Sequence, residues 1–337
     1  MGNIESIEDK ELIEFNKSIY KWYKKMDKSI LTVVSVPFNT NMIFRKVILE
    51  NINLNKKILY IWGREEQDNK LLFELRKEIK NITSTYVKEG YGSYDINFAS
   101  INNIHNLSGK YDLVIIDDIS NFSNIDKCRL KGILSSAKLL SKRIILYTIE
   151  SIIEYGDELE VIPVNRKNPY VEPRVLNTRI DLNYDIPVIL YEYIKWFIAS
   201  KSKIVIFVPD EEKLNLVYRY YTKKLRMKRI NIIPLLRSEE ESIINNVLRN
   251  EDMSTIIITD CLEGRLEDSS IGNAIILFAD SDKYGYKRLL YLCCEIGKIN
   301  ERLPEVLLVS KEVSEDMELV KDITRSYNKK KWAKYTD

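Results

Sequence analysis

Two adjacent carboxylates, Asp117 and Asp118, are the side chains in this sequence best placed to do chemistry. They stand at the end of YDLVIID (111–117), whose apolar residues predict a buried β-strand. At the carboxyl edge of a parallel sheet, one such carboxylate can hold Mg²⁺ while its neighbour orients an attacking water. The plain alternative is that the pair ends a strand and caps the following turn. The segment by itself leaves both interpretations open.

Cysteine and histidine give little support to other catalytic or metal chemistry. The four cysteines are Cys128, Cys261, Cys293 and Cys294, and no pair has C-x-x-C spacing. The single histidine, His105, has no nucleophile suggested by a local pattern. We therefore expect no zinc or other metal site, and we interpret Cys293 and Cys294 as small apolar residues on a buried helix face.

The composition excludes some classes of protein. The chain has 337 residues, 45% apolar and 30% charged, which suits about two domains with buried cores. Its 52 basic and 50 acidic residues leave a net charge of +2, so any nucleic-acid site must be local rather than a bulk polycation. Only 11 residues are glycine, the residue from which phosphate-binding loops are built.

No segment predicts export or membrane insertion. The N-terminal residues MGNIESIEDKELIEF lack the basic and apolar regions of a signal peptide. No apolar run approaches the length of about 18 residues that crosses a bilayer. We expect a cytoplasmic protein, which would reach the inner face of a membrane only through a partner.

The apolar periodicity predicts alternating strands and helices in the first part of the chain. Helical spacing predicts helices at 5–28, 41–52, 69–80 and 127–140. Short β-branched runs predict strands at 31–36, 56–62, 95–100, 111–117 and 142–148. This alternation is typical of an α/β fold with a parallel sheet.

The alternation stops over residues 156–185 and then resumes. Four prolines, Pro163, Pro169, Pro173 and Pro187, lie close together, so we predict an extended connector between a lobe at 1–155 and a lobe at 186–337. In the second lobe, the predicted strands are 202–209, 230–236, 254–260, 273–280 and 304–310. The predicted helices there are 186–200, 211–225, 239–250, 286–297 and 314–332.

From about residue 15 to 332, the chain resembles the superfamily 2 helicases, and among them the ComFA family of competence DNA-uptake translocases. YDLVIIDDISNF (111–122) is similar to motif II, and SKIVIFVPDEEKL (202–214) to the opening of the second lobe. NAIILFADSDKYGYKRLLYLCCEIGK (273–298) is similar to the stretch leading into motif VI. The resemblance implies an α/β fold of two RecA-like lobes, each a mainly parallel sheet flanked by helices. In an active member, Asp117 and Asp118 would be catalytic and Mg–ATP would be the cofactor.

The phosphate-binding loop departs from the family pattern. A helicase of this superfamily has a glycine-rich loop ending in Lys-Thr, whose backbone N–H groups and lysine hold the phosphates. In SVPFNTNMIF (35–44), Asn39 stands at the lysine position and Thr40 at the threonine that binds Mg²⁺. Pro37 and Phe38 replace glycines, and an uncharged asparagine cannot neutralise phosphate charge. We expect a degenerate nucleotide site and no bound cofactor.

Motif VI departs in the same direction. Its Q-x-x-G-R-x-G-R pattern supplies arginines that stabilise a transferring phosphoryl group. The matching residues here are Tyr291, Cys294, Glu295, Gly297 and Lys298, and a glutamate at an arginine position would repel that group. From the cysteine count, we also expect no counterpart of the family's four-cysteine zinc module. The interpretation is a pseudo-ATPase that acts as a single-stranded DNA-binding or partner-binding module in DNA uptake or processing.

The resemblance also implies residues that contact nucleic acid. They are Arg64 at motif Ia, Ser100 and Asn102 near motif Ib, and Thr259 in motif V. Each has the plain alternative of a solvated loop residue. Two further interpretations remain open: an active ATP-dependent translocase with unorthodox motifs, and a structural protein partner without nucleic-acid affinity.

Overall fold

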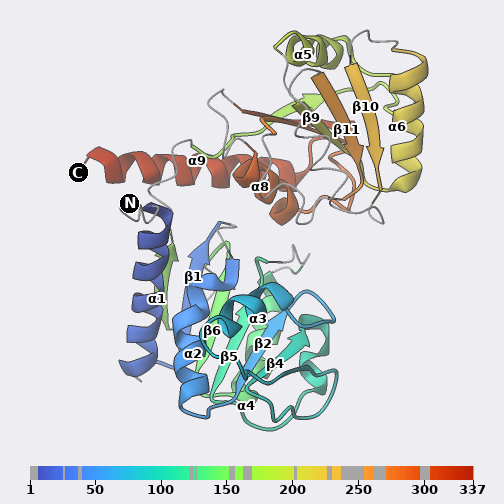
Figure 1. The fold of residues 1–337 in the computed structure, drawn as a ribbon. Coiled ribbons are helices and arrows are strands. Elements are labelled where there is room, and N and C mark those ends of the chain that lie inside the picture. The colour runs from blue at the N-terminus through green and yellow to red at the C-terminus, as the bar shows by residue number, and fades with distance from the viewer. Residues whose placement is uncertain are drawn as a thin grey trace. The chain divides into compact units, whose positions relative to one another are not determined.

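The computed structural model describes residues 7–25, 27–36, 40–120, 125, 127–151, 156–161, 169–200, 203–225, 230–236, 254–261, 271–296 and 304–336. The chain divides into two compact units, Met1–Asn165 and Arg166–Asp337. Each unit is built on one parallel sheet with helices against it, as Figure 1 shows, and each is described by itself. The predicted α/β fold class is confirmed.

Unit 1 contains a seven-stranded sheet in the order β3-β4-β2-β5-β6-β1-β7. The strands are β1 Ile30–Ser35, β2 Ile58–Trp62, β3 Ser84–Tyr86, β4 Ile96–Ser100, β5 Leu113–Asp117, β6 Ile144–Thr148 and β7 Asp157–Val161. The helices are α1 Ile7–Lys25, α2 Arg45–Asn53, α3 Asn69–Arg76 and α4 Lys127–Leu140, with 3-10 helices η1 Thr40–Phe44 and η2 Ile101–Asn106. α1 packs beside α2, as Figure 1 shows.

The central strands of unit 1 are buried on both faces. Every residue of β1, β2, β4, β5 and β6 is buried, because helices cover both faces of a parallel sheet. Such strands are continuous apolar runs, which is why the sequence predicted all five. The short strand β3 was not predicted, because its three residues are only half-buried.

Unit 2 contains a six-stranded sheet in the order β10-β11-β9-β12-β13-β8. The strands are β8 Arg174–Asn177, β9 Lys203–Phe207, β10 Ile230–Leu235, β11 Ser254–Thr259, β12 Asn273–Leu277 and β13 Glu305–Ser310. The helices are α5 Val188–Ala199, α6 Glu211–Lys223, α8 Tyr286–Glu295 and α9 Glu315–Thr336, and α8 packs against α9 (Figure 1). The predicted helix at 239–250 lies outside the described residues.

The predicted connector at 156–185 is not simply an extended link. Strand β7 pairs with β1 at the edge of the first sheet, and β8 pairs with β13 at the edge of the second. An edge strand has a neighbour on one side only, so its sequence need not be a continuous apolar run. DELEV in β7 alternates charged and apolar residues, and for this reason the apolar pattern did not predict a strand there.

Within the part of the chain described, no helix combines the length and hydropathy needed to cross a bilayer.

Candidate functional site

The carboxyl ends of the parallel strands of unit 1 bring the predicted motif residues to one edge of the sheet. Asp117 ends β5 and Ser100 ends β4, while Trp62, two residues before the predicted Arg64, ends β2. Trp62 and Ser100 are paired in register, and Asp117 is paired with Tyr147 of β6. This edge is where an open α/β sheet normally binds its ligand, so the sequence placed these residues at the expected edge.

The Asp117 carboxylate is buried and fully hydrogen-bonded. Oδ1 accepts from the backbone N–H groups of Ile119 at 3.1 Å and Ser120 at 2.9 Å. Oδ2 accepts from the hydroxyl of Tyr60 at 2.5 Å and from that of Ser120 at 2.5 Å. A carboxylate oxygen has about two lone-pair sites, so both oxygens are saturated.

Burial is the largest influence on the pKa values of Asp117 and Tyr60. It raises the pKa of Asp117, whose exposed fraction is 1%, while the hydrogen bonds from Ser120, Tyr60 and Ile119 oppose the rise. Burial, followed by the charge of Asp117, raises the pKa of Tyr60 well above its usual value. Tyr60 therefore remains a protonated donor, and its hydroxyl holds the carboxylate toward β2.

These contacts decide whether Asp117 fits a metal-bound nucleotide. A carboxylate that holds Mg²⁺ directly, or through its water, needs an oxygen lone pair to offer. Asp117 would first have to release Tyr60 or Ser120, so the residue as it stands does not fit Mg–ATP. Asp118 is 2% exposed, and its backbone N–H donates to the carbonyl of Tyr147 at 3.0 Å, which ties β5 to β6.

The other predicted nucleotide-site residues are only partly described. Asn39 and Lys298 lie outside the described residues, and Thr40 begins η1, which leads directly into α2. Glu295 is the last residue of α8 and is 7% exposed. Cys293 and Cys294 are completely buried on the same helix, and burial raises the pKa of the Cys293 thiol, which therefore stays protonated.

The four residues predicted to bind nucleic acid differ in accessibility. Ser100 is fully buried, and its hydroxyl accepts from the N–H of Asn102 at 3.3 Å, where it caps η2. Thr259 is also buried, and its Oγ1 accepts from the N–H of Cys261 at 3.1 Å. Both hydroxyls therefore hold their own turns. Arg64 and Asn102 are exposed, and only their side chains among the four can extend toward a ligand.

The two exposed residues make separate local contacts on unit 1. Arg64 contacts Glu66 at 3.3 Å and lies over the Trp62 ring, with its guanidinium carbon 5.8 Å from the ring centre. Asn102 Oδ1 accepts from Nη2 of Arg129 on α4 at 2.7 Å. No sequence motif singled out Arg129 or Tyr60. A tyrosine inside an aliphatic strand was the one signal for Tyr60, because a buried hydroxyl needs a partner.

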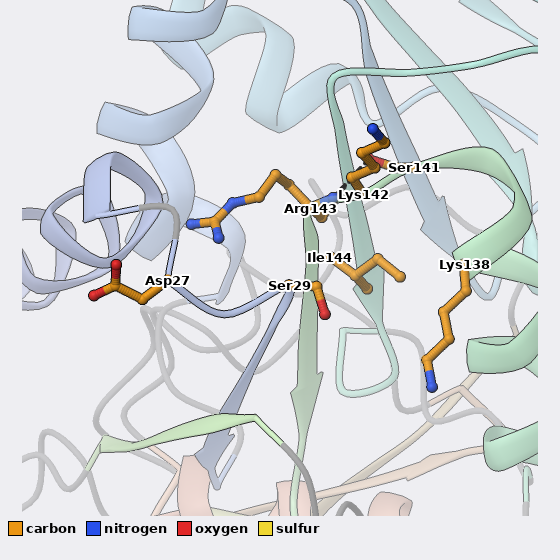
Figure 2. A pocket seen from close by; sticks show the side chains of 7 residues that line it. All are labelled: Asp27, Ser29, Lys138, Ser141, Lys142, Arg143 and Ile144. Atoms are coloured by element: carbon orange, nitrogen blue, oxygen red, sulfur yellow. Dashed lines mark hydrogen bonds between the residues drawn. The ribbon is translucent and has the colours of Figure 1, made fainter.

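A hollow of about 590 Å³ lies at the opposite, amino edge of the first sheet. Asp27, Ser29, Lys138, Lys142 and Arg143 are among its lining residues, and Figure 2 shows the two lysine side chains pointing away from one another. The cations therefore do not converge on one ligand. Arg143 itself faces α1, where its guanidinium donates to the carbonyls of Trp22 at 2.8 Å, Tyr23 at 3.0 Å and Lys28.

Comparison with solved structures identifies the fold. The helicase MrfA bound to DNA and AMPPNP is similar with a TM-score of 0.50 and 14% identity, over 98% of this chain and 53% of MrfA. Mycobacterium smegmatis Lhr bound to ssDNA and AMP-PNP gives a TM-score of 0.50 and 9% identity, over 98% of this chain and 50% of Lhr. The E. coli DExH-box NTPase HrpB gives a TM-score of 0.59 and 13% identity, over 91% of this chain and 42% of HrpB. No family model and no curated protein matches the sequence.

These similarities show the fold: two RecA-like units, each a parallel sheet flanked by helices, as in the helicase structures that the chain matches. The chain spans about half the length of the solved structures it matches. At such low identity the similarity shows the fold alone. Any binding or catalysis by this chain depends on its own residues.

Proposed function

We propose that this chain is a helicase-fold protein that binds single-stranded DNA and does not hydrolyse ATP. The observation that carries the proposal is the saturated Asp117 carboxylate, whose two oxygens accept hydrogen bonds from Tyr60, Ile119 and Ser120. Asn39 in place of the phosphate-binding lysine adds to it, because asparagine supplies no positive charge. Kinship with the ComFA translocases and a role in DNA uptake or processing belong to the same proposal and rest on the sequence resemblance.

Binding of nucleic acid is supported by exposed polar side chains on unit 1. Arg64 and Arg129 are cations, and Asn102 lies beside Arg129, in elements that follow β2, β4 and β5. Arginine side chains hold backbone phosphates, and contacts of this kind do not depend on base sequence. MrfA and Lhr are both described as bound to DNA or ssDNA. We therefore choose single-stranded DNA as the ligand to test first.

The lack of hydrolysis is tested by phosphate release from Mg–ATP, with and without a single-stranded oligonucleotide. The expected result is a rate no higher than that of the Asp117→Ala variant under either condition. Hydrolysis that the oligonucleotide stimulates, and that Asp117→Ala abolishes, would establish the active translocase instead. In that case, Tyr60 and Ser120 must release the carboxylate during turnover.

Binding is tested by fluorescence anisotropy over a range of salt concentrations. The wild-type chain should bind a labelled oligonucleotide at low salt, with affinity falling as salt rises. Replacing Arg64 and Arg129 together with alanine should weaken binding about tenfold and make the salt slope shallower by about 1.4, which is two phosphate contacts on a single strand.

The matched control is Lys142→Ala, which removes an exposed cation at the opposite edge of the same sheet. It should leave the affinity and the salt slope unchanged. No binding by the wild-type chain at low salt would favour the structural-partner alternative. Equal weakening by both changes would show that the interaction is non-specific.

A further inference from the structure

Helix α5 is apolar around most of its circumference. Its sequence, VILYEYIKWFIA, contains two charged residues, Glu192 and Lys195. Leu190, Ile194 and Phe197 are at most 1% exposed and pack into the core of unit 2 with residues of β9 and α6. A surface helix needs only this one apolar stripe, and a helix that is apolar on its outer side as well is normally covered there.

The outer side of α5 carries three of the most exposed apolar side chains in the described residues. Val188 is 74% exposed, Ile189 60% and Trp196 55%, and Tyr184, just before the helix, is 62% exposed. Positions 188, 189, 192, 195, 196 and 199 fall on one face by helical spacing, and all six are exposed. Figure 1 shows α5 at the margin of unit 2. Large exposed apolar side chains gathered on one helix face mark an interaction surface.

The two charges lie in the middle of this face and pair with one another. Lys195 Nζ lies 3.0 Å from Glu192 Oε1 and 5.4 Å from the centre of the Tyr191 ring. In an antiparallel overlap of two such helices over residues 188–199, Val188 lies opposite the partner's Ala199 and Glu192 opposite the partner's Lys195. In this register, small and apolar residues lie opposite each other and opposite charges lie opposite each other. The face is therefore complementary to a second copy of itself.

We propose that two copies of this chain associate through the outer face of α5, antiparallel about a twofold axis. A lipid surface or a nucleic acid would select a face with an excess of positive charge, whereas this face carries one glutamate and one lysine. A single twelve-residue helix offers less than the ~800 Å² per partner of a stable interface. The dimer is therefore weak and concentration-dependent, with dissociation in the micromolar range.

Sedimentation analysis of the full chain tests this directly. Between about 1 µM and about 300 µM, the mean mass of the wild-type chain should rise from that of a monomer toward that of a dimer. The Trp196→Asp variant should remain monomeric throughout, with an unchanged circular dichroism spectrum because the side chain is outside the core. A wild-type chain that remains monomeric over the whole range overturns the proposal.

Charge exchange tests the antiparallel register. Glu192→Lys alone, or Lys195→Glu alone, places like charges opposite each other and should weaken the dimer about tenfold. The double exchange restores opposite charges and should restore the wild-type constant. The matched control exchanges Glu74 and Lys77, an ion pair of the same spacing at the C-terminal end of α3, and should have no effect. If the double exchange is as weak as either single one, the register is wrong.

Vesicles of neutral and of anionic phospholipid test whether a lipid surface, instead of a second copy of the chain, binds the outer face of α5. Wild-type protein should remain in the supernatant when either kind of vesicle is sedimented. Co-sedimentation of monomeric protein that Trp196→Asp abolishes would assign the face to a lipid surface and overturn the dimer. This proposal does not depend on the proposed function, because α5 contributes none of the residues assigned to nucleic acid or nucleotide.

Discussion

Replacing Arg143 with alanine is expected to lower the free energy of unfolding of unit 1 by about 3–5 kcal/mol. The guanidinium donates to the carbonyls of Trp22, Tyr23 and Lys28, and its carbon lies 3.9 Å from the centre of the Trp22 ring. The last carbonyls of a helix have no partner within that helix, so Arg143 caps α1 and fixes it to the start of β6. Its loss removes the guanidinium donors from these carbonyls, of which those of Trp22 and Tyr23 accept in buried contacts.

Burial lowers the pKa of Arg143, and the neighbouring Tyr23, Asp157 and Asp27 oppose that shift. The side chain nonetheless stays charged at neutral pH, because the pKa of an unperturbed arginine lies far above neutrality. Arg143→Lys should recover only part of the loss, because an ammonium group cannot reproduce the planar set of donors that the guanidinium offers.

Urea unfolding provides the measurement, with the transition of unit 1 followed separately from that of unit 2. Trp22 and Trp62 report on unit 1 by fluorescence if Trp196 and Trp332 are first replaced with phenylalanine in the reference chain. Lys142→Ala is the control, since this neighbouring cation is exposed and should change stability by less than about 0.5 kcal/mol. An Arg143→Ala chain as stable as the control would show that α1 does not depend on this cap.

At Asp117, alanine and asparagine are expected to have very different effects. Asp117→Ala leaves the hydroxyl of Tyr60 buried without its acceptor and should cost about 2–4 kcal/mol. Asp117→Asn should cost less than the alanine change, because the amide oxygen can still accept from two N–H groups and the amide nitrogen donates to the oxygens of the two hydroxyls, so only the hydroxyl protons lose their acceptor. Thermal or urea unfolding of the same reference chain measures both.

The difference between the wild-type chain and Asp117→Asn should depend on pH with a definite sign. Burial raises the folded pKa of Asp117 above its unfolded value, which is about 3.9, so the folded chain binds more protons in this range. The wild-type chain therefore loses stability as pH rises from below the unfolded pKa through the folded pKa. The asparagine variant has no such titration, so its stability rises relative to that of the wild-type chain over the same pH range.

Subtracting the two pH profiles removes the contributions of the other carboxylates, which both chains share. If the wild-type chain instead becomes more stable relative to the asparagine variant as pH rises, the hydrogen bonds affect the pKa of Asp117 more than burial does. It would also return Asp117 to the class of readily ionised carboxylates that suit a metal ion. The pH profile therefore bears on the nucleotide site as well as on stability.

These two sites rest on contacts between residues far apart in the sequence. Tyr60 and Asp117 are separated by 57 positions, and Trp22 and Arg143 by 121. The first contact requires β2 and β5 to be neighbours in the sheet, and the second requires α1 to end beside the start of β6. Sequence periodicity describes one element at a time and cannot specify such neighbours.

The sequence by itself determined the central strands and the main helices, the parallel α/β class and the edge to which the motif residues belong. Continuous burial of strands such as LVIID at 113–117 demands a local apolar run, and that run is visible without a structure. The asparagine at position 39 and the glutamate at 295 are likewise facts of the sequence. Only the tertiary structure decided that Tyr60 saturates Asp117, that Arg143 caps α1, that β7 and β8 complete the sheet edges, and that α5 leaves an apolar face uncovered. Each depends on which elements become neighbours, and that choice is made by packing of the whole unit.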